Sequence, residues 1–404
     1  MLKMLCIFYL IFLSIITQIS AQCLEDGVYF DCEYVTSDSK DLINRRKNIH
    51  EENMLQIVEF VCDSNDTDLC SKARNAFEIA SLKISKVFIF NTPIFVNASF
   101  IDFCKTFNVC GNSPNDVPIG GAKPARQMLM RDDDGVERFY PQALVKQYKL
   151  QKHPQFASYD IKADFNSIAN WWFEGDGKPI QGHQRDFVEI ILHEYFHGLG
   201  FKSNWDDWIN TEPNLKALFP LPIFRLESQN SSSLIFDGFK ESVFDKYVIL
   251  LSNGQNISEV NAQLNLFAGG PGAKFQNKSD FESQFYNSTQ YNQIAKQMFI
   301  NAQTDKSMGF LPHNKKKHSI ILETSLVPYI RGSSISHVDQ KTFENTSDFL
   351  MKYSINWLET LNRDMSKGRH FFGGPIGPLL RSIMETIGYA TPRHPHPYRP
   401  TLVT

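Results

Sequence analysis

Two histidines one helical turn apart constrain the fold of this chain more than any other feature of the sequence. His193 and His197 enclose the pattern His-Glu-x-x-His, and the apolar residues from Phe187 to Leu192 before them predict a helix. On a helix, side chains at positions i and i+4 lie on one face, so both imidazoles can reach one metal ion. Because a catalytic metal site needs three protein ligands, the fold must bring a third ligand to this helix.

Glu194 stands beside these histidines, displaced around the helix, where it would face a water molecule rather than the ion. Zinc lowers the pKa of such a water, and a neighbouring carboxylate can take its proton as the water attacks a peptide carbonyl. The pattern therefore predicts one catalytic Zn²⁺ ion, with Glu194 as the general base. Gly200 follows closely, and a positive φ at this glycine would turn the chain out of the helix.

The third ligand is absent from the place where a compact zinc motif would carry it, because residue 203 is a serine. None of the candidate carboxylates lies in a clear helical pattern, and three of the candidate histidines lie in a lysine-rich loop or a turn. The residues alone leave the choice open among seven candidates: Glu212, Glu227, Glu241, His313, His318, His337 and His370.

The best surroundings are those of His337, and here the sequence resembles a known family. HEYFHGLGF, followed at a distance by His337 and then by DFLM, resembles the metzincin clan of zinc endopeptidases, and more narrowly its leishmanolysin-like branch. In that branch an insertion separates the glycine from the third histidine, and a methionine follows in a tight turn. The resemblance implies that His193, His197 and His337 bind zinc and that Glu194 is the general base.

The same resemblance assigns further roles. Gly200 becomes the turning glycine and Met351 the methionine of the turn, while SIMETIGY matches the helix that closes such domains. Tyr353 becomes a candidate catalytic helper that steadies an oxyanion, with a packed core tyrosine as the alternative. The match covers the catalytic helix, the stretch from His337 to Met351 and the final helix, and the 140 residues from His197 to His337 (337 − 197) are more than the branch leads us to expect.

The resemblance also implies a fold class. We expect an α+β, zincin-like catalytic domain with a twisted mixed sheet, an antiparallel edge strand, an active-site helix and a mostly irregular or helical C-terminal subdomain. The edge strand would pair with an extended protein or peptide substrate through main-chain hydrogen bonds. The candidate for this strand is the alternating stretch Asp160, Ile161, Lys162, Ala163, Asp164, Phe165 and Asn166.

The start of the chain has the layout of a secretory signal peptide over residues 1–21, with Lys3, an apolar run and the small residue Ala21. No later stretch is long and apolar enough to cross a membrane, so we expect no membrane span after cleavage. We expect the cleaved protein to be secreted, extracellular and monomeric. The net charge of −3 gives no reason to expect nucleic acid as a partner.

Cysteines and glycosylation motifs agree with an oxidising compartment. The close spacings of the six cysteines after the signal favour the disulfides Cys23–Cys32, Cys62–Cys70 and Cys104–Cys110. Seven Asn-x-Ser/Thr motifs suggest a glycoprotein, at Asn65, Asn97, Asn230, Asn256, Asn277, Asn287 and Asn345.

After the signal peptide, residues 22–80 are expected to form a disulfide-bearing helical segment that is either a cap or a removable pro-segment. Its apolar positions follow helical spacing over 41–62 and 67–82. A Cys62–Cys70 bridge would then join two helices.

The metallopeptidase domain is expected over residues 81–392, with an insertion at about 204–330. The polar composition of 252–318 predicts a surface region with little core of its own. A helix with one apolar face should end at Gly388, before a Pro-rich tail over 393–404.

These features predict a secreted zinc-dependent endopeptidase. The alternative is a catalytically silent secreted glycoprotein, a binding module that retains a structural zinc site. A zinc hydrolase that acts on a non-peptide amide is a weaker third possibility.

Overall fold

The computed structural model describes residues 21–36, 53–111, 117–209, 216–228, 231–313, 318–368 and 373–403. These residues form a mixed α/β fold, as expected, in which several small sheets share one large hydrophobic core. Residues 1–20 of the predicted signal peptide, the first part of the helix predicted over 41–62, Asn230 and the candidate ligands Glu212 and His370 lie outside the described residues.

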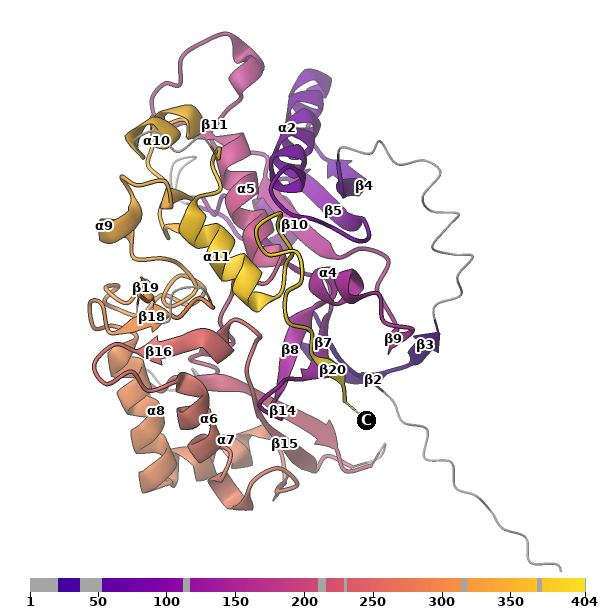
Figure 1. The fold of residues 1–404 in the computed structure, drawn as a ribbon, viewed down its shortest axis with the longest axis vertical. Coiled ribbons are helices and arrows are strands. Elements are labelled where there is room, and N and C mark those ends of the chain that lie inside the picture. The colour runs from indigo at the N-terminus through magenta and orange to yellow at the C-terminus, as the bar shows by residue number, and fades with distance from the viewer. Residues whose placement is uncertain are drawn as a thin grey trace, which may run out of the picture.

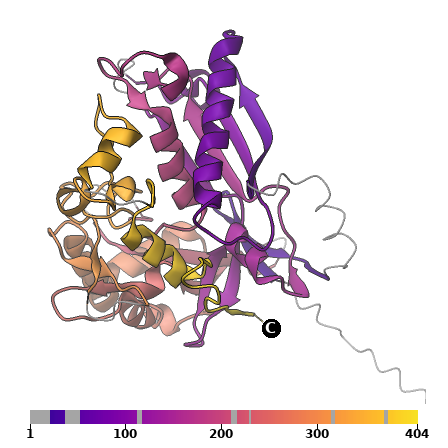
Figure 2. The same cartoon turned by 45° about the horizontal axis from the view of Figure 1, so that its top comes forward.

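A four-stranded mixed sheet carries the helix of the His-Glu motif. Its strand order is β4-β5-β10-β6, in which the first three strands are parallel and β6 runs antiparallel at the edge. Helices α2 and α5 lie side by side against this sheet (Figures 1 and 2). The bounds are β4 (Leu55–Cys62), β5 (Ile94–Ile101), β10 (Ile161–Asn166), β6 (Gly120–Pro124), α2 (Thr67–Ser85) and α5 (Phe187–Gly198).

The prediction that residues 160–166 form the edge strand is wrong. β10 lies inside the sheet between β5 and β6, and the edge is β6, with the sequence GGAKP. Alternation in β10 correctly marks a strand, but it carries no information about which strands lie on either side. Strand β6 could not be predicted from β-propensity, because glycine and proline are rare in strands.

Helix α5 is fixed at its start by a cap and an aromatic cluster. The Asp186 side chain accepts hydrogen bonds from the N–H groups of Val188 and Glu189, at 3.0 and 3.3 Å. The fully buried ring of Phe187 then packs against five other rings at centroid distances of 4.6–5.6 Å, from Phe77, Phe100, Phe165, Trp171 and Phe173. These contacts tie the beginning of α5 to α2, β5 and β10.

The helix predicted over 41–62 is wrong for its described part, because residues 55–62 form strand β4. Val58 and Val61, which suggested a helical face, are 51% and 47% exposed. Three apolar residues at positions 57, 58 and 61 fit a twisted strand with a bulge as well as a helix, and β4 does contain an irregular register between Ile57 and Glu59. The helix predicted over 67–82 is confirmed as α2.

A second sheet joins both ends of the described chain to its middle. Strand β7 pairs with β1, β8 and β20, and β1 also pairs with β2, so parts of the predicted N-terminal segment and the Pro-rich tail lie in one sheet with the central chain. All three predicted disulfides are present. The bounds are β1 (Ala21–Glu25), β2 (Val28–Cys32), β7 (Gln127–Arg131), β8 (Glu137–Pro141) and β20 (Thr401–Leu402), with β3 (Tyr34–Thr36) paired separately to β9 (Lys152–Pro154).

The insertion has its own core, contrary to the prediction of a surface region with little core. Phenylalanines at 267, 275, 281 and 285 are buried and pack against one another, and the last three also pack against rings from β14 and β15. Its elements are β13 (Trp205–Asp206), β14 (Phe219–Leu226), β15 (Leu234–Lys240), β16 (Val248–Leu250), α6 (Ile257–Leu264), β17 (Lys274–Phe275), α7 (Lys278–Asn287), α8 (Thr289–Asn301), β18 (Met308–Phe310) and β19 (Ile320–Ile321). Figure 1 shows these elements gathered below the α5 sheet.

The closing helix is confirmed as α11, which ends at Gly388 with a φ of 127°. No helix in the described part of the chain is both long and apolar enough to cross a membrane. The remaining elements are α3 (Phe103–Phe107), α4 (Gln142–Val145), β11 (Trp171–Trp172), β12 (Arg185–Asp186), α9 (Gln340–Phe343), α10 (Leu361–Lys367), α11 (Pro378–Ile387) and 3₁₀ turns at Lys146–Tyr148, Glu174–Asp176, Asp245–Tyr247, Phe267–Gly269 and Phe349–Met351.

The aromatic cluster predicts a large effect of truncation at Phe187. Phe187→Ala should lower the free energy of unfolding by about 3–5 kcal/mol, because it removes a buried ring from the joint between α5 and the sheet. Denaturant titration followed by tryptophan fluorescence measures this loss. Phe107→Ala is the matched control, because Phe107 is 46% exposed, and equal losses in the two variants would contradict the proposed joint.

Candidate metal centre

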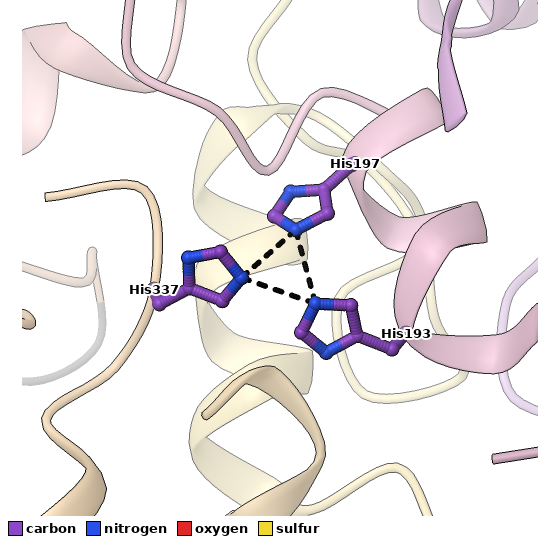
Figure 3. Close-up of side chains that lie close together, drawn as sticks. All are labelled: His193, His197 and His337. Atoms are coloured by element: carbon purple, nitrogen blue, oxygen red, sulfur yellow. Dashed lines mark hydrogen bonds between the residues drawn. The ribbon is translucent and has the colours of Figure 1, made fainter. Parts of the chain in front are cut away.

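Three histidines from distant parts of the sequence meet at one point. His193 and His197 project from α5, and His337 comes from the segment just before α9 (Figure 3). Their Nε2 atoms are separated by 3.1, 3.2 and 3.2 Å. All three side chains are buried, with exposed fractions of 5%, 8% and 5%. The structure thus brings together the three residues that the resemblance implied as ligands.

Main-chain carbonyls determine the orientation of each ring. The Nδ1 atoms of His193, His197 and His337 lie 2.7, 2.7 and 2.9 Å from carbonyl oxygens, which belong to Leu350, Phe201 and Ser333 respectively. Since a carbonyl oxygen only accepts hydrogen bonds, each Nδ1 must carry the proton and donate it. The three Nε2 atoms of neutral rings are then acceptors with lone pairs.

The donor set therefore fits a metal ion. Burial lowers the pKa of His193 to about 4 and that of His337 to about 3, and it lowers the pKa of His197 well below its usual value. All three rings are neutral at pH 7, and three converging lone pairs with no proton between them repel one another. A cation relieves this repulsion, and tetrahedral ligands at 2.0–2.1 Å from zinc lie about 3.3 Å apart. Three imidazoles suit zinc among the common biological metals.

Glu194 lies between the histidine cluster and the edge of the sheet. Its Oε2 accepts a hydrogen bond from the N–H of Ala122 on β6 at 2.9 Å. Burial raises the pKa of Glu194 to about 8, whereas the Ala122 N–H acts in the opposite direction. A carboxyl group with this pKa is mostly protonated at pH 7. A cation bound by the neighbouring histidines would favour the charged carboxylate, which is the form that a general base needs.

The turn at Met351 supports His193 through its main chain. Phe349–Met351 form a buried 3₁₀ turn that presents the carbonyl of Leu350 to His193, and the Met351 carbonyl accepts a hydrogen bond from Val338 N–H at 2.9 Å. The turn therefore links the segment of the third histidine to α5. Gly200 has a φ of 106°, and a Cβ there would lie 2.9 Å from Pro141, so this position requires glycine.

A buried ion pair fixes the residue that follows the Phe349–Met351 turn. The Lys352 ammonium, fully buried, donates to Asp364 at 2.9 Å, and the buried carboxyl of Glu189 on α5 lies close to the same pair. Burial raises the pKa of Glu189 well above its usual value, and the neighbouring charge of Asp364 adds to this effect. The raised pKa favours the uncharged form of Glu189, which avoids a second unpaired negative charge inside the core.

Other predicted residues do not join the centre. Tyr353 is 37% exposed, so it is not a packed core tyrosine. In the described part of the chain, no hydrogen bond connects its hydroxyl to the three histidines. Glu227 pairs with Lys274, and Glu241 pairs with Arg138. His313 contacts Thr386 and the ring of His394, and His318 is exposed.

The three aspartates at 132–134 are neutralised from within the chain. Arg138 contacts the carboxylates of Asp132 and Asp134, and Lys246 contacts those of Asp132 and Asp133. Sequence reasoning missed Ala122 and the three carbonyl acceptors, because main-chain groups leave no residue-type signal.

The site defines a class of protein: a mixed α/β chain in which one helix and a distant turn carry a buried histidine cluster. The family model described as SPBPB7E8-like matches residues 19–404, so the chain belongs to the SPBPB7E8-like family. A curated relative, the uncharacterized protein PB7E8.01 of Schizosaccharomyces pombe (strain 972 / ATCC 24843), is 29% identical over 348 residues, covering 81% of this chain. The chain spans 60% of the length of that relative. No solved structure matches the chain.

Removal of the third imidazole tests the geometry of the cluster. His337→Ala should lower zinc affinity by more than about 100-fold, because even the outer partners of metal ligands are worth 10–100-fold. Metal analysis after dialysis against a zinc buffer measures the loss. His318→Ala, at an exposed histidine, should keep the full zinc content, and a His337→Ala variant that keeps it too would show that His337 is not a ligand.

Proposed function

We propose that this protein is a secreted zinc-dependent endopeptidase with a zincin-like catalytic domain of the metzincin type. The observation that carries the proposal is the convergence of three neutral imidazoles beside a carboxylate that contacts the edge strand of a sheet. His193, His197 and His337 would hold the ion. When bound, zinc supplies a Lewis acid that polarises a peptide carbonyl and acidifies a water molecule.

Glu194 performs the proton transfers in this proposal. Its carboxylate accepts the proton of the attacking water and delivers it to the nitrogen of the leaving amine. The hydrogen bond from Ala122 N–H holds one carboxylate oxygen in place and leaves the other oxygen for the proton. Glu194 is half-buried, whereas its neighbours on α5 are buried.

Among the strands that the structure describes, none pairs with the outer edge of β6, and this edge offers the binding surface for an extended peptide. Ile119 and Ala125, which lie beyond the ends of β6, bond towards the β10 side, through the Ile119 carbonyl and the Ala125 N–H. Since strand residues alternate in direction, the main-chain groups of Gly120, Ala122 and Pro124 face the opposite side, and the bond from Ala122 to Glu194 agrees with this. A substrate strand added here would lie directly beside the general base.

Secretion is supported by the three disulfides, because such bonds persist in oxidising compartments. Their sequence separations are 9, 8 and 6 residues, so they tie local loops rather than distant parts of the chain. The layout of residues 1–21 as a signal peptide supports the same proposal.

Substitution of the general base tests the chemistry. Glu194→Gln should lower hydrolysis of an unfolded protein substrate by about 10²–10⁴-fold, because it removes the proton acceptor but leaves the three imidazoles. Peptide release from casein, with metal content measured on the same samples, gives both readouts. Glu259→Gln, an exposed residue on α6, is the control.

Two results would argue against this proposal. Hydrolysis that persists in Glu194→Gln would mean that the activity arises elsewhere. A wild-type protein that binds zinc tightly but cleaves no member of a broad panel of unfolded proteins would favour the binding module with a structural metal site.

Glycosylation tests the proposed route of export. Expression in a eukaryotic host should give secreted protein that carries glycans at Asn65, Asn277, Asn287 and Asn345, whose side chains are exposed. Asn256 should stay unmodified, because its side chain is partly buried and its Nδ2 donates to the Lys246 main-chain carbonyl at 2.7 Å. Mass analysis before and after enzymatic deglycosylation reads each site, and an intracellular, unglycosylated product would contradict secretion.

A further inference from the structure

A cavity of about 400 Å³ is lined by residues of β6 and by the segment that follows α5. Its lining includes Lys123 and Pro124, which follow Ala122 on β6. It also includes Gly200 and Lys202, which follow His197 in the chain. A peptide in extended conformation advances about 3.3 Å per residue. A substrate paired with β6 beside Glu194 would therefore present side chains one to three residues from the cleaved bond to this cavity.

The walls of the cavity are mostly apolar, with charged groups at the rim. The apolar part comes from β1, β8, β14 and the segment after α5, and includes Leu24, Phe139, Pro141, Trp208, Leu221 and Phe224. The charged residues around it are Asp26, Lys123, Lys202, Asp206 and Lys278.

The negative charges at the rim already have partners. Asp26 pairs with Lys123 at 2.6 Å, and Asp206 accepts from Arg331 Nε at 2.7 Å and from the hydroxyl of Tyr329 at 3.2 Å. Both aspartates are therefore compensated before a substrate arrives. The cavity keeps a surplus of positive charge.

That surplus is centred on Lys202. Among the described residues, no ion pair or side-chain hydrogen bond joins its ammonium group to a partner, whereas Lys123 has Asp26 and Lys278 has Glu282 at 3.8 Å. Its main chain is held on both sides, because its N–H donates to the Gly200 carbonyl and its carbonyl accepts from Ser242 Oγ at 2.8 Å. Lys202 is thus an unpaired cation on a fixed backbone at the mouth of an apolar cavity.

We propose that this cavity is a specificity pocket for an acidic side chain of the substrate, aspartate or glutamate, and that Lys202 is its specificity-determining residue. The methylene groups of the acidic side chain would lie against the apolar wall while its carboxylate pairs with the ammonium group. This inference rests on the proposed peptidase function and names the class of peptide that the site prefers.

Matched peptides test the pocket. The set consists of fluorescent peptides with blocked ends that differ only by Glu, Gln or Lys at one position within three residues of the cleaved bond, so that a terminal carboxylate cannot contribute. Wild-type protein should cleave the Glu peptide with a kcat/KM about tenfold to hundredfold above that of the Gln peptide, as expected for a hydrogen bond to a charged group. Lys202→Met should bring this ratio close to one, and Lys202→Glu should favour the Lys peptide.

Two controls make the test decisive. Lys296→Met removes an exposed lysine of α8 and should keep the wild-type ratio. The same peptides are also titrated by fluorescence anisotropy against the Glu194→Gln protein, which measures binding without hydrolysis. Acid-selective binding that Lys202→Met abolishes supports the pocket even if no peptide is cleaved, in which case only the peptidase function fails. Equal binding and cleavage of the Glu and Gln peptides, or an unchanged ratio in Lys202→Met, would overturn the pocket while leaving the peptidase function intact.

Discussion

Each ring of the histidine cluster is held by a hydrogen bond from Nδ1 to a main-chain carbonyl, and the geometry of the whole centre depends on this constraint. The bonds fix the tautomers, so that only unprotonated Nε2 atoms face one another at 3.1–3.2 Å. The carbonyls of Phe201, Ser333 and Leu350 come from three different places in the chain, the first of them just after α5. The fold therefore stores an arrangement of lone pairs that is unfavourable without a cation, and the core must be rigid enough to maintain it.

This rigidity comes from contacts at both ends of α5. At its start, the ring of Phe187 joins the helix to α2 and the sheet, and at its end, positive φ at Gly200 turns the chain under the histidines. Below the helix, the buried pair Lys352–Asp364 lies against Glu189 and fixes the turn that presents the Leu350 carbonyl. A buried ion pair adds little net stability, because removing both charges from water costs about as much as their attraction returns. Removal of one partner, however, leaves a buried charge without compensation, so the pair mainly fixes the conformation of the turn.

Much of this arrangement could be predicted from the sequence, wherever the signal was local. The period of apolar residues predicted α5 and α11, and close cysteine spacing predicted the disulfides. His337 came from a resemblance, because nothing in its own residues selects it among seven candidates. The edge strand was missed since Gly-Gly-Ala-Lys-Pro lacks β-propensity and strand order depends on distant neighbours. The core of the insertion was missed since its phenylalanines are spread through a polar sequence.

The serine at position 203 explains how the chain can take its third imidazole from so far away. The long insertion between His197 and His337 would leave the position of His337 poorly fixed unless the two ends of the insertion were joined. The Ser203 hydroxyl donates to the buried carboxylate of Asp245, which also accepts from the N–H of Asn204 and from the N–H and hydroxyl of Ser242. One carboxylate thus joins the first residues of the insertion to a point about forty residues later (245 − 203 = 42). The Ser203 N–H also donates to Ser336 Oγ at 3.2 Å, beside His337 itself. Ser203, at the position that a compact motif would use for a ligand, therefore joins the two ends of the insertion. The histidine cluster keeps its geometry despite the inserted residues.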